Sequence, residues 1–84
     1  MDRKEIEAKV ASIIKGTLGE ESLRIQENDR LIDDLELSSL EVLELLSALE
    51  EEFDCRIAEK KSREFVTVRD IVEYIIAVNG GMEA

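Results

Sequence analysis

The sequence predicts an all-α protein: a small four-helix bundle of three longer helices and one short helix, with a long loop between the first two helices. Two observations carry this prediction. In three segments, apolar residues recur at intervals of three and four positions, which places them on one face of an α-helix. A residue type that caps helix N-termini precedes each segment, and no proline interrupts any of the 84 residues. We expect residues 1–84 to form a single domain.

The first helix is expected at about residues 3 to 17. Asp2 followed by Glu5 has the form of a capped helix start. Gly19 is a natural end, because glycine readily adopts the left-handed conformation that closes many helices. The apolar stripe between these ends consists of Ile6, Val10, Ile13, Ile14 and Leu18. Residues 19–37 have no helical period but contain several leucines and isoleucines, so we expect a loop packed against the bundle.

The second helix has the clearest signal and is expected at about residues 39 to 52. Ser38 and Glu41 form a capping box, in which each side chain bonds the backbone N–H of the other residue. Ser38 is then the N-cap, and Ser39 is the first helical residue, with its hydroxyl free to face solvent. The expected buried face consists of Leu43, Leu46, Leu49 and Phe53, flanked by Leu40, Val42 and Leu45.

The remaining signals are a short helical turn and a last helix. Residues 55–64 are polar, with Ile57 as the expected anchor and a helical turn near 59–63. Thr67 and Asp70 repeat the capping pattern at the start of the last helix. Its apolar stripe consists of Val68, Ile71, Val72, Ile75 and Ile76. Gly80 and Gly81 are expected to end this helix, and the tail from about residue 80 is expected to be disordered.

Composition excludes several classes of function. The absence of histidine excludes a histidine-based triad and an imidazole metal site. The acidic loop lacks the glycine and the ligand spacing of a calcium-binding loop, so we expect neither a metal site nor catalytic residues. Cys55 has no partner for an internal disulfide, which suits a reducing compartment. No apolar run approaches the roughly 18 residues of a membrane span. We therefore expect a cytoplasmic monomer that does not bind membranes.

The charge of the chain is strongly acidic and concentrated. The net charge of −10 argues against nucleic acid and anionic membranes as partners. Between residues 29 and 54, ten acidic side chains stand against Arg30 alone. Such a segment suits the docking of basic partner proteins, and it is equally compatible with a solvated helix face.

The segment DDLELSSLEVLEL, from Asp33 to Leu45, resembles the acyl carrier protein family, whose modification motif is Asp-Ser-Leu at the start of a long acidic helix. The similarity continues through residues 48–54, which resemble the end of that helix. Residues 65–68 and the pair Tyr74-Ile75 resemble the last helix of the family, and residues 13–14 and 18–19 its first helix. The correspondence covers nearly the whole chain without gaps, so the fold that it implies is the bundle of the acyl carrier type.

This resemblance implies that Ser39 carries a covalent 4′-phosphopantetheine arm, whose thiol holds acyl groups as thioesters for fatty-acid, polyketide or related lipid biosynthesis. It implies two kinds of partner: a phosphopantetheinyl transferase, and acyl-loading and acyl-processing enzymes with basic docking patches. These enzymes and the arm supply the chemistry, so the chain needs no catalytic residue. The docking residues implied are Glu41, Glu44, Glu50 and Glu51. The implied candidates for an acyl pocket are Leu43, Leu46, Leu49, Ile57, Ile71 and Ile75.

Two positions depart from the family motif. Ser38 stands where the family has aspartate, and Glu36 stands where it has glycine. These departures favour a specialised carrier over the housekeeping carrier of fatty-acid synthesis. Two alternative functions keep the same fold. One is a peptidyl or aminoacyl carrier, and the other is an unmodified adaptor that acts only through protein–protein contacts.

Overall fold

The computed structural model describes residues 2–79. Its helices in this range are α1 (Arg3–Leu18), α2 (Ser39–Phe53), α3 (Glu59–Ser62) and α4 (Val68–Asn79). The predicted all-α class is confirmed: the described residues contain no strand, only an isolated bridge between Arg30 and Thr67. The expectations for Gly80, Gly81 and the tail lie outside the described residues.

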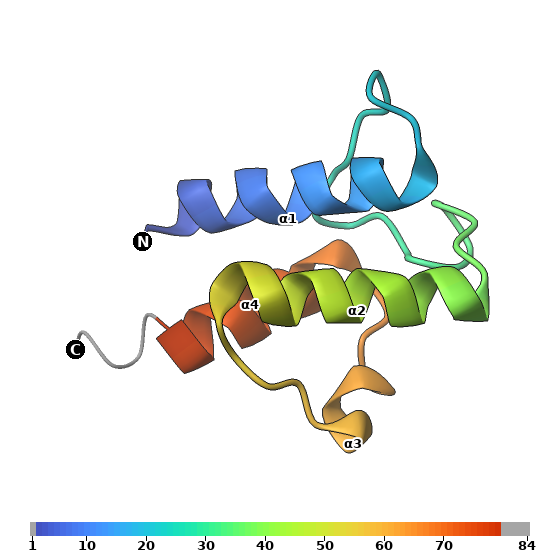
Figure 1. Ribbon diagram of the computed structural model, residues 1–84. Helices are drawn as coiled ribbons and strands as arrows, with labels where there is room; N and C mark the ends of the chain where they lie inside the picture. The colour runs from blue at the N-terminus through green and yellow to red at the C-terminus, as the bar shows by residue number, and fades with distance from the viewer. Residues whose placement is uncertain (1, 80–84) are drawn as a thin grey trace.

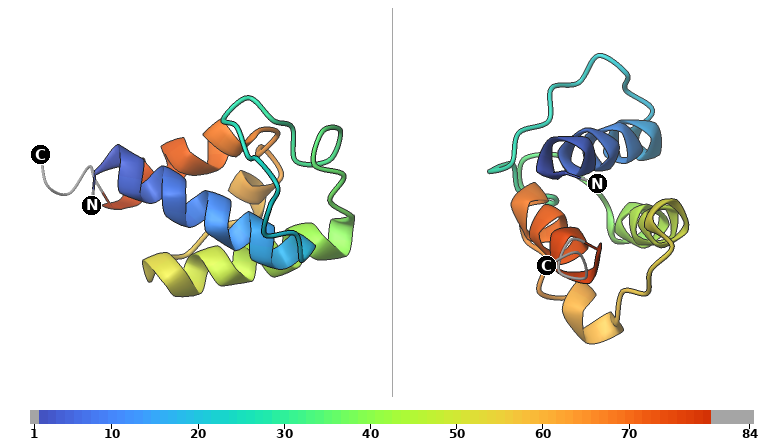
Figure 2. Two further views of the ribbon diagram at one scale, coloured as in Figure 1. Left: turned by 90° about the horizontal axis from the view of Figure 1, so that it is seen from above. Right: turned by 90° about the vertical axis from the view of Figure 1, so that its left-hand side faces the viewer.

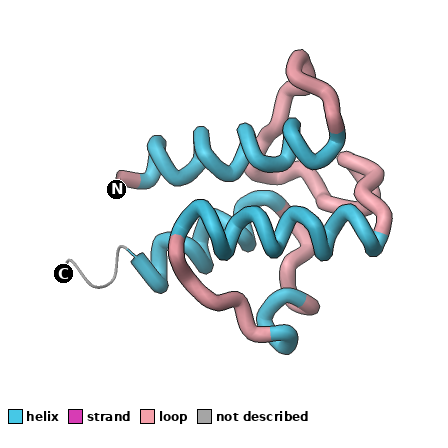
Figure 3. Tube along the Cα trace, viewed as in Figure 1, coloured by secondary structure: helices cyan, strands magenta, loops and turns pink. Residues whose placement is uncertain are grey.

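The three longer helices surround one core, and α3 lies apart from α1. Helix α1 contacts both α2 and α4. Seen along the bundle, α1, α2 and α4 form a triangle, and α3 lies below the side between α2 and α4 (Figures 1 and 2). Three connections carry no helix: the long loop between α1 and α2, and the two short segments 54–58 and 63–67 on either side of α3 (Figure 3).

The predicted helix caps are confirmed. The Asp2 carboxylate accepts the N–H of Glu5 at 2.9 Å. In the capping box, Ser38 Oγ accepts the N–H of Glu41 at 3.1 Å, and Glu41 Oε1 accepts the N–H of Ser38 at 2.9 Å. Helix α1 ends at Gly19, whose φ of 72° lies in the left-handed region that glycine tolerates best.

The start of α4 is fixed by reciprocal bonds between Thr67 and Asp70. Thr67 Oγ1 accepts the N–H of Asp70 at 3.3 Å, while Asp70 Oδ2 accepts the N–H groups of Val66 and Thr67 at 2.8 and 3.0 Å. Burial alone would raise the pKa of the Asp70 carboxyl, but the hydrogen bonds from Thr67 and Val66 outweigh it and lower this pKa. The contribution of Asp70 to stability is therefore present at neutral pH and is lost as the pH falls through the lowered pKa.

The long loop packs against the bundle, as predicted, through three leucines. Leu31, Leu35 and Leu37 are buried together with the apolar faces of the helices. The loop is also tied to the start of α4, because Leu31 N–H bonds the Val66 carbonyl at 2.9 Å and Val68 N–H bonds the Asp29 carbonyl at 3.0 Å. The core residues contributed by the helices are Ile6, Val10, Ile14, Leu45, Leu49, Phe53, Val68, Ile71, Val72 and Ile75.

The predicted buried face of α2 is wrong in part. Leu45 and Leu49 are fully buried and Phe53 is 4% exposed, but Leu43 is 61% exposed and Leu46 is only half-buried. Helix α2 is apolar around much of its circumference, so two overlapping stripes satisfy the helical period. Packing against α1 and α4 selects the stripe centred on Leu45. The neighbouring stripe faces α3, which has no buried residue of its own and leaves that flank open.

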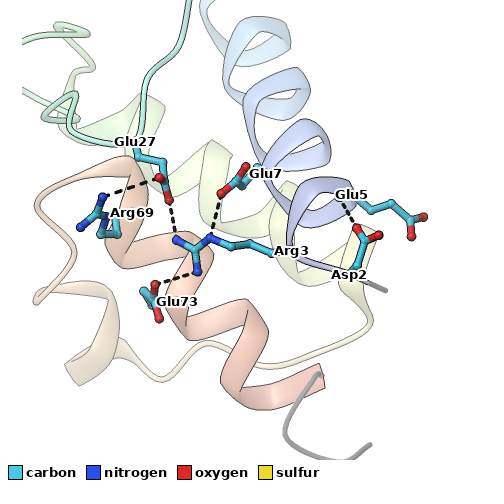
Figure 4. Close-up of polar contacts among 7 residues, drawn as sticks. All are labelled: Asp2, Arg3, Glu5, Glu7, Glu27, Arg69 and Glu73. Atoms are coloured by element: carbon cyan, nitrogen blue, oxygen red, sulfur yellow. Dashed lines mark hydrogen bonds and ion pairs between the residues drawn. The ribbon is translucent and has the colours of Figure 1, made fainter.

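Arg3 connects α1, α4 and the long loop at the end of the bundle that lies opposite the start of α2 (Figures 1 and 4). Its guanidinium bonds Glu7 of α1 and Glu73 of α4, each at 2.9 Å, and also Glu27 of the long loop. Arg69 of α4 contributes a second contact to Glu27, at 3.6 Å. The hydrogen bond from Arg3 lowers the pKa of Glu27, so this link to the loop weakens in acid.

Candidate functional site

Ser39 is the first residue of α2 and is exposed. The neighbouring hydroxyl of Ser38 is occupied, because it accepts the N–H of Glu41 as the N-cap. The Ser39 hydroxyl has no hydrogen bond to any of residues 2–79. It also lies at the positive end of the helix dipole, where a phosphate is favoured by about 0.3–1 kcal/mol. Of the two serines, Ser39 is therefore the one whose hydroxyl is open to modification.

A groove of about 680 Å³ opens beside Ser39. One wall is the flank of α2 that carries Ser39, Val42, Leu43 and Leu46. The facing wall combines the loop between α1 and α2 with α3 and the segment after it. The facing residues are Arg30, Leu31, Ile32, Asp33, Glu59, Ser62, Arg63, Phe65 and Val66. The groove is thus mainly apolar along α2, while the facing wall carries both apolar and charged side chains.

The candidates for an acyl pocket divide into two groups. Leu43 and Leu46 line the groove. Leu49, Ile71 and Ile75 are fully buried in the core and Ile57 is half-buried against it, and none of these four lines the groove.

Sequence reasoning missed the apolar residues that line the groove from outside the helices. Ile32 and Val66 are 60% and 56% exposed, and Phe65 lies between Val66 and α3. The one signal for them was their apolar character in segments without a helical period. That signal does not distinguish a groove wall from a loop residue that packs into the core, as Leu31 does.

The four candidate docking glutamates also divide into two pairs. The carboxylate of Glu41 accepts the N–H of Ser38, and that of Glu50 accepts the N–H of Ile57 at 2.8 Å. Glu44 and Glu51 are exposed, and neither has a hydrogen bond or ion pair to another described residue. Seven positions separate them, so they lie on the same face of α2, about 10 Å apart along its axis. Glu44 and Glu51 are therefore the carboxylates open to a partner.

Three further findings concern the Cys55 thiol, metal binding and membrane-spanning helices. Burial raises the pKa of the Cys55 thiol, with added contributions from the carboxylates of Glu50 and Asp54, which disfavours the reactive thiolate at neutral pH. Among the described residues, no group of three or more metal-binding side chains could hold an ion. None of the helices within residues 2–79 is long and apolar enough to cross a membrane.

Comparisons with known proteins agree on one family. The family described as "Phosphopantetheine attachment site" matches residues 8–75. The acyl carrier protein of Borreliella burgdorferi strain ZS7 is 44% identical over 75 residues, which cover 89% of this chain and 94% of that protein. The acyl carrier protein of Akkermansia muciniphila is 39% identical over 80 residues, which cover 95% of this chain and 100% of that protein.

A solved structure extends the likeness to three dimensions. A candidate acyl carrier protein from Mycobacterium tuberculosis superposes with a TM-score of 0.79 at 32% identity, covering 87% of this chain and 96% of that one. Members of this family are carriers and not enzymes. They bear covalent 4′-phosphopantetheine and interact with a phosphopantetheinyl transferase and with acyl-processing enzymes. Because the family match spans most of the chain and the relatives cover nearly all of it, this chain belongs to the acyl carrier protein family.

Proposed function

We propose that Ser39 bears the 4′-phosphopantetheine arm and that the chain carries acyl groups on it for fatty-acid, polyketide or related lipid biosynthesis, in a specialised role. The observation that carries this proposal is the exposure of Ser39, which is the first residue of α2 and lines the groove. The hydroxyl of Ser38, the one alternative in this motif, is engaged as the N-cap.

The residues around Ser39 have separate roles in this proposal. The N-terminus of α2 stabilises the phosphodiester through its partial positive charge. The apolar flank of α2, with Leu43 and Leu46, is the surface on which an acyl chain on the arm can rest. Each methylene buried there contributes about 0.8 kcal/mol. We also propose that the chain acts as a monomer, because its net negative charge opposes self-association. We propose further that residues 1–84 form one domain and that the protein acts in the cytoplasm.

Intact mass tests the attachment. The purified chain is incubated with coenzyme A and a broad-specificity phosphopantetheinyl transferase, and we expect the mass to increase by a single phosphopantetheine group. Subsequent incubation with an acyl-loading enzyme and an acyl-coenzyme A should transfer one acyl group to the thiol of the arm as a thioester and release coenzyme A. A chain that keeps its unmodified mass with several transferases would contradict the carrier function and favour the adaptor.

Reversal of one exposed charge tests the docking face. We expect Glu44→Lys to slow the transfer of the arm roughly tenfold at low ionic strength, because docking to a basic patch is steered by charge. The difference should shrink at high salt, where exposed charges are screened. The measurement is the initial rate of mass conversion at several salt concentrations.

Glu5→Lys is the matched control for this variant. Glu5 is exposed in the first turn of α1, at the opposite end of the bundle from Ser39, and the change in net charge is the same. It should leave the rate close to that of the wild type. Equal rates for Glu44→Lys and Glu5→Lys at every salt concentration would mean that the acidic face of α2 is only a solvated surface.

A further inference from the structure

We propose that Glu50 is a positioning residue that, together with Tyr74, holds α3 as the outer wall of the groove, and that it does not dock partner proteins. The functional meaning of this wall depends on the proposed role of the groove beside Ser39. The structural part of the inference depends only on contacts within the chain.

The side chains of Glu50 and Tyr74 form hydrogen bonds with the N–H and the carbonyl of the same peptide group. Glu50 Oε2 accepts the N–H of Ile57 at 2.8 Å, and the Tyr74 hydroxyl donates to the carbonyl of Arg56 at 2.7 Å. This N–H and this carbonyl belong to the same planar peptide unit, where they point in opposite directions. The peptide unit is therefore fixed between α2, which carries Glu50, and α4, which carries Tyr74.

Both residues make a second contact that strengthens this arrangement. The backbone carbonyl of Glu50 accepts the N–H of Cys55 at 3.1 Å as well as that of Asp54, so the end of α2 is closed at the residue whose side chain bonds Ile57. The ring of Tyr74 packs edge-on against Phe65, with ring centroids 5.6 Å apart. Tyr74 thereby contacts the chain both before and after α3.

Helix α3 depends on these contacts, because it has little packing of its own. It has four residues, none of them buried, and no side chain bonds the N–H groups at its start. Glu59, Ser62 and the adjacent Arg63 nevertheless form part of the groove wall. The position of this wall is therefore set by the segments that flank α3, and the clamped peptide unit lies two residues before Glu59.

Glu51 shows why the two neighbouring glutamates should differ in function. Its carboxylate is exposed and has no hydrogen bond or ion pair within residues 2–79. Glu50 is half-buried, and a partner that drew its carboxylate outward would leave the N–H of Ile57 without an acceptor. The carboxylate of Glu51 can be engaged without disturbing any bond between described residues.

Amide hydrogen exchange on the unloaded protein tests the positioning role. In Glu50→Ala we expect the hydrogen-bonded amides of Ile57, Ser62 and Arg63 to exchange about tenfold faster, with the α1 amides unchanged. Tyr74→Phe, which removes only the hydroxyl, should accelerate the same amides. Glu50→Gln keeps an acceptor oxygen and should stay close to wild type, as should Glu51→Ala. Unchanged exchange at Ile57 in both Glu50→Ala and Tyr74→Phe would overturn the inference.

Rates of arm transfer test the second half of the inference. Glu50→Gln and Glu51→Gln remove one negative charge from adjacent positions, and we expect the larger loss of rate from Glu51→Gln. If Glu50→Gln slows transfer as much and with the same salt dependence, Glu50 is a docking residue and the inference fails. If no variant and no wild-type sample accepts an arm, the proposed function fails, while the exchange results still decide whether Glu50 positions α3.

Discussion

Replacing Ser39 by alanine is expected to abolish attachment of the arm and to leave the fold intact. The phosphodiester needs the hydroxyl of the modified serine, and Ser39 is the serine of the motif whose hydroxyl is exposed and has no partner among residues 2–79. Alanine is the best helix former and replaces an exposed residue in the first turn of α2, so the melting temperature should change little. Intact mass after incubation with transferase and coenzyme A measures the loss.

Ser38→Ala is the matched control and should have the opposite profile. It removes the N-cap oxygen that accepts the N–H of Glu41, so it should destabilise the protein by about 1 kcal/mol. That loss corresponds to a fall in melting temperature of roughly 4–8 °C for a domain of this size. The arm should still be attached at Ser39. Peptide mapping that located the arm on Ser38, or an arm that persisted in Ser39→Ala, would overturn the assignment.

Replacing Leu45 by alanine is expected to cause a large loss of stability. Leu45 is fully buried between α2 and its neighbours, and truncation of a buried leucine to alanine costs about 2–5 kcal/mol. The total stability of an 84-residue protein is on the order of 4–12 kcal/mol, so this variant should melt at least about 8 °C lower or unfold. Thermal or urea unfolding followed by circular dichroism measures the change.

Leu43→Ala separates the effect of burial from that of residue type. The change is the same and the position is two residues away on the same helix, but Leu43 is 61% exposed. We expect its effect on the unloaded protein to lie within about 0.5 kcal/mol. Equal losses at Leu43 and Leu45 would mean that the flank of α2 facing α3 is packed as tightly as the core. A stabilising effect of a bound acyl chain should, in contrast, depend on Leu43.

Local signals in the sequence determined the secondary structure of this protein. The capping residues Asp2, Ser38 and Thr67 each bond an N–H group three residues away, and Gly19 ends α1 through its own backbone freedom. Each of these interactions is complete within one helical turn, so a sequence read by itself can specify it. The proposal of Ser39 rather than Ser38 as the attachment site follows from the same reasoning, since the occupied hydroxyl of Ser38 is a property of the capping box alone.

Only the tertiary structure decided which faces of these elements are used. On α2, the stripes through Leu43 and Leu45 are equally periodic, and the positions of α1 and α4 bury the second one and leave the first beside the groove. The contacts of Glu50 and Tyr74 with one peptide unit join residues up to 18 positions apart, and no local pattern encodes them. Capping and periodicity act along the chain, whereas burial and long-range hydrogen bonds depend on where the other helices lie.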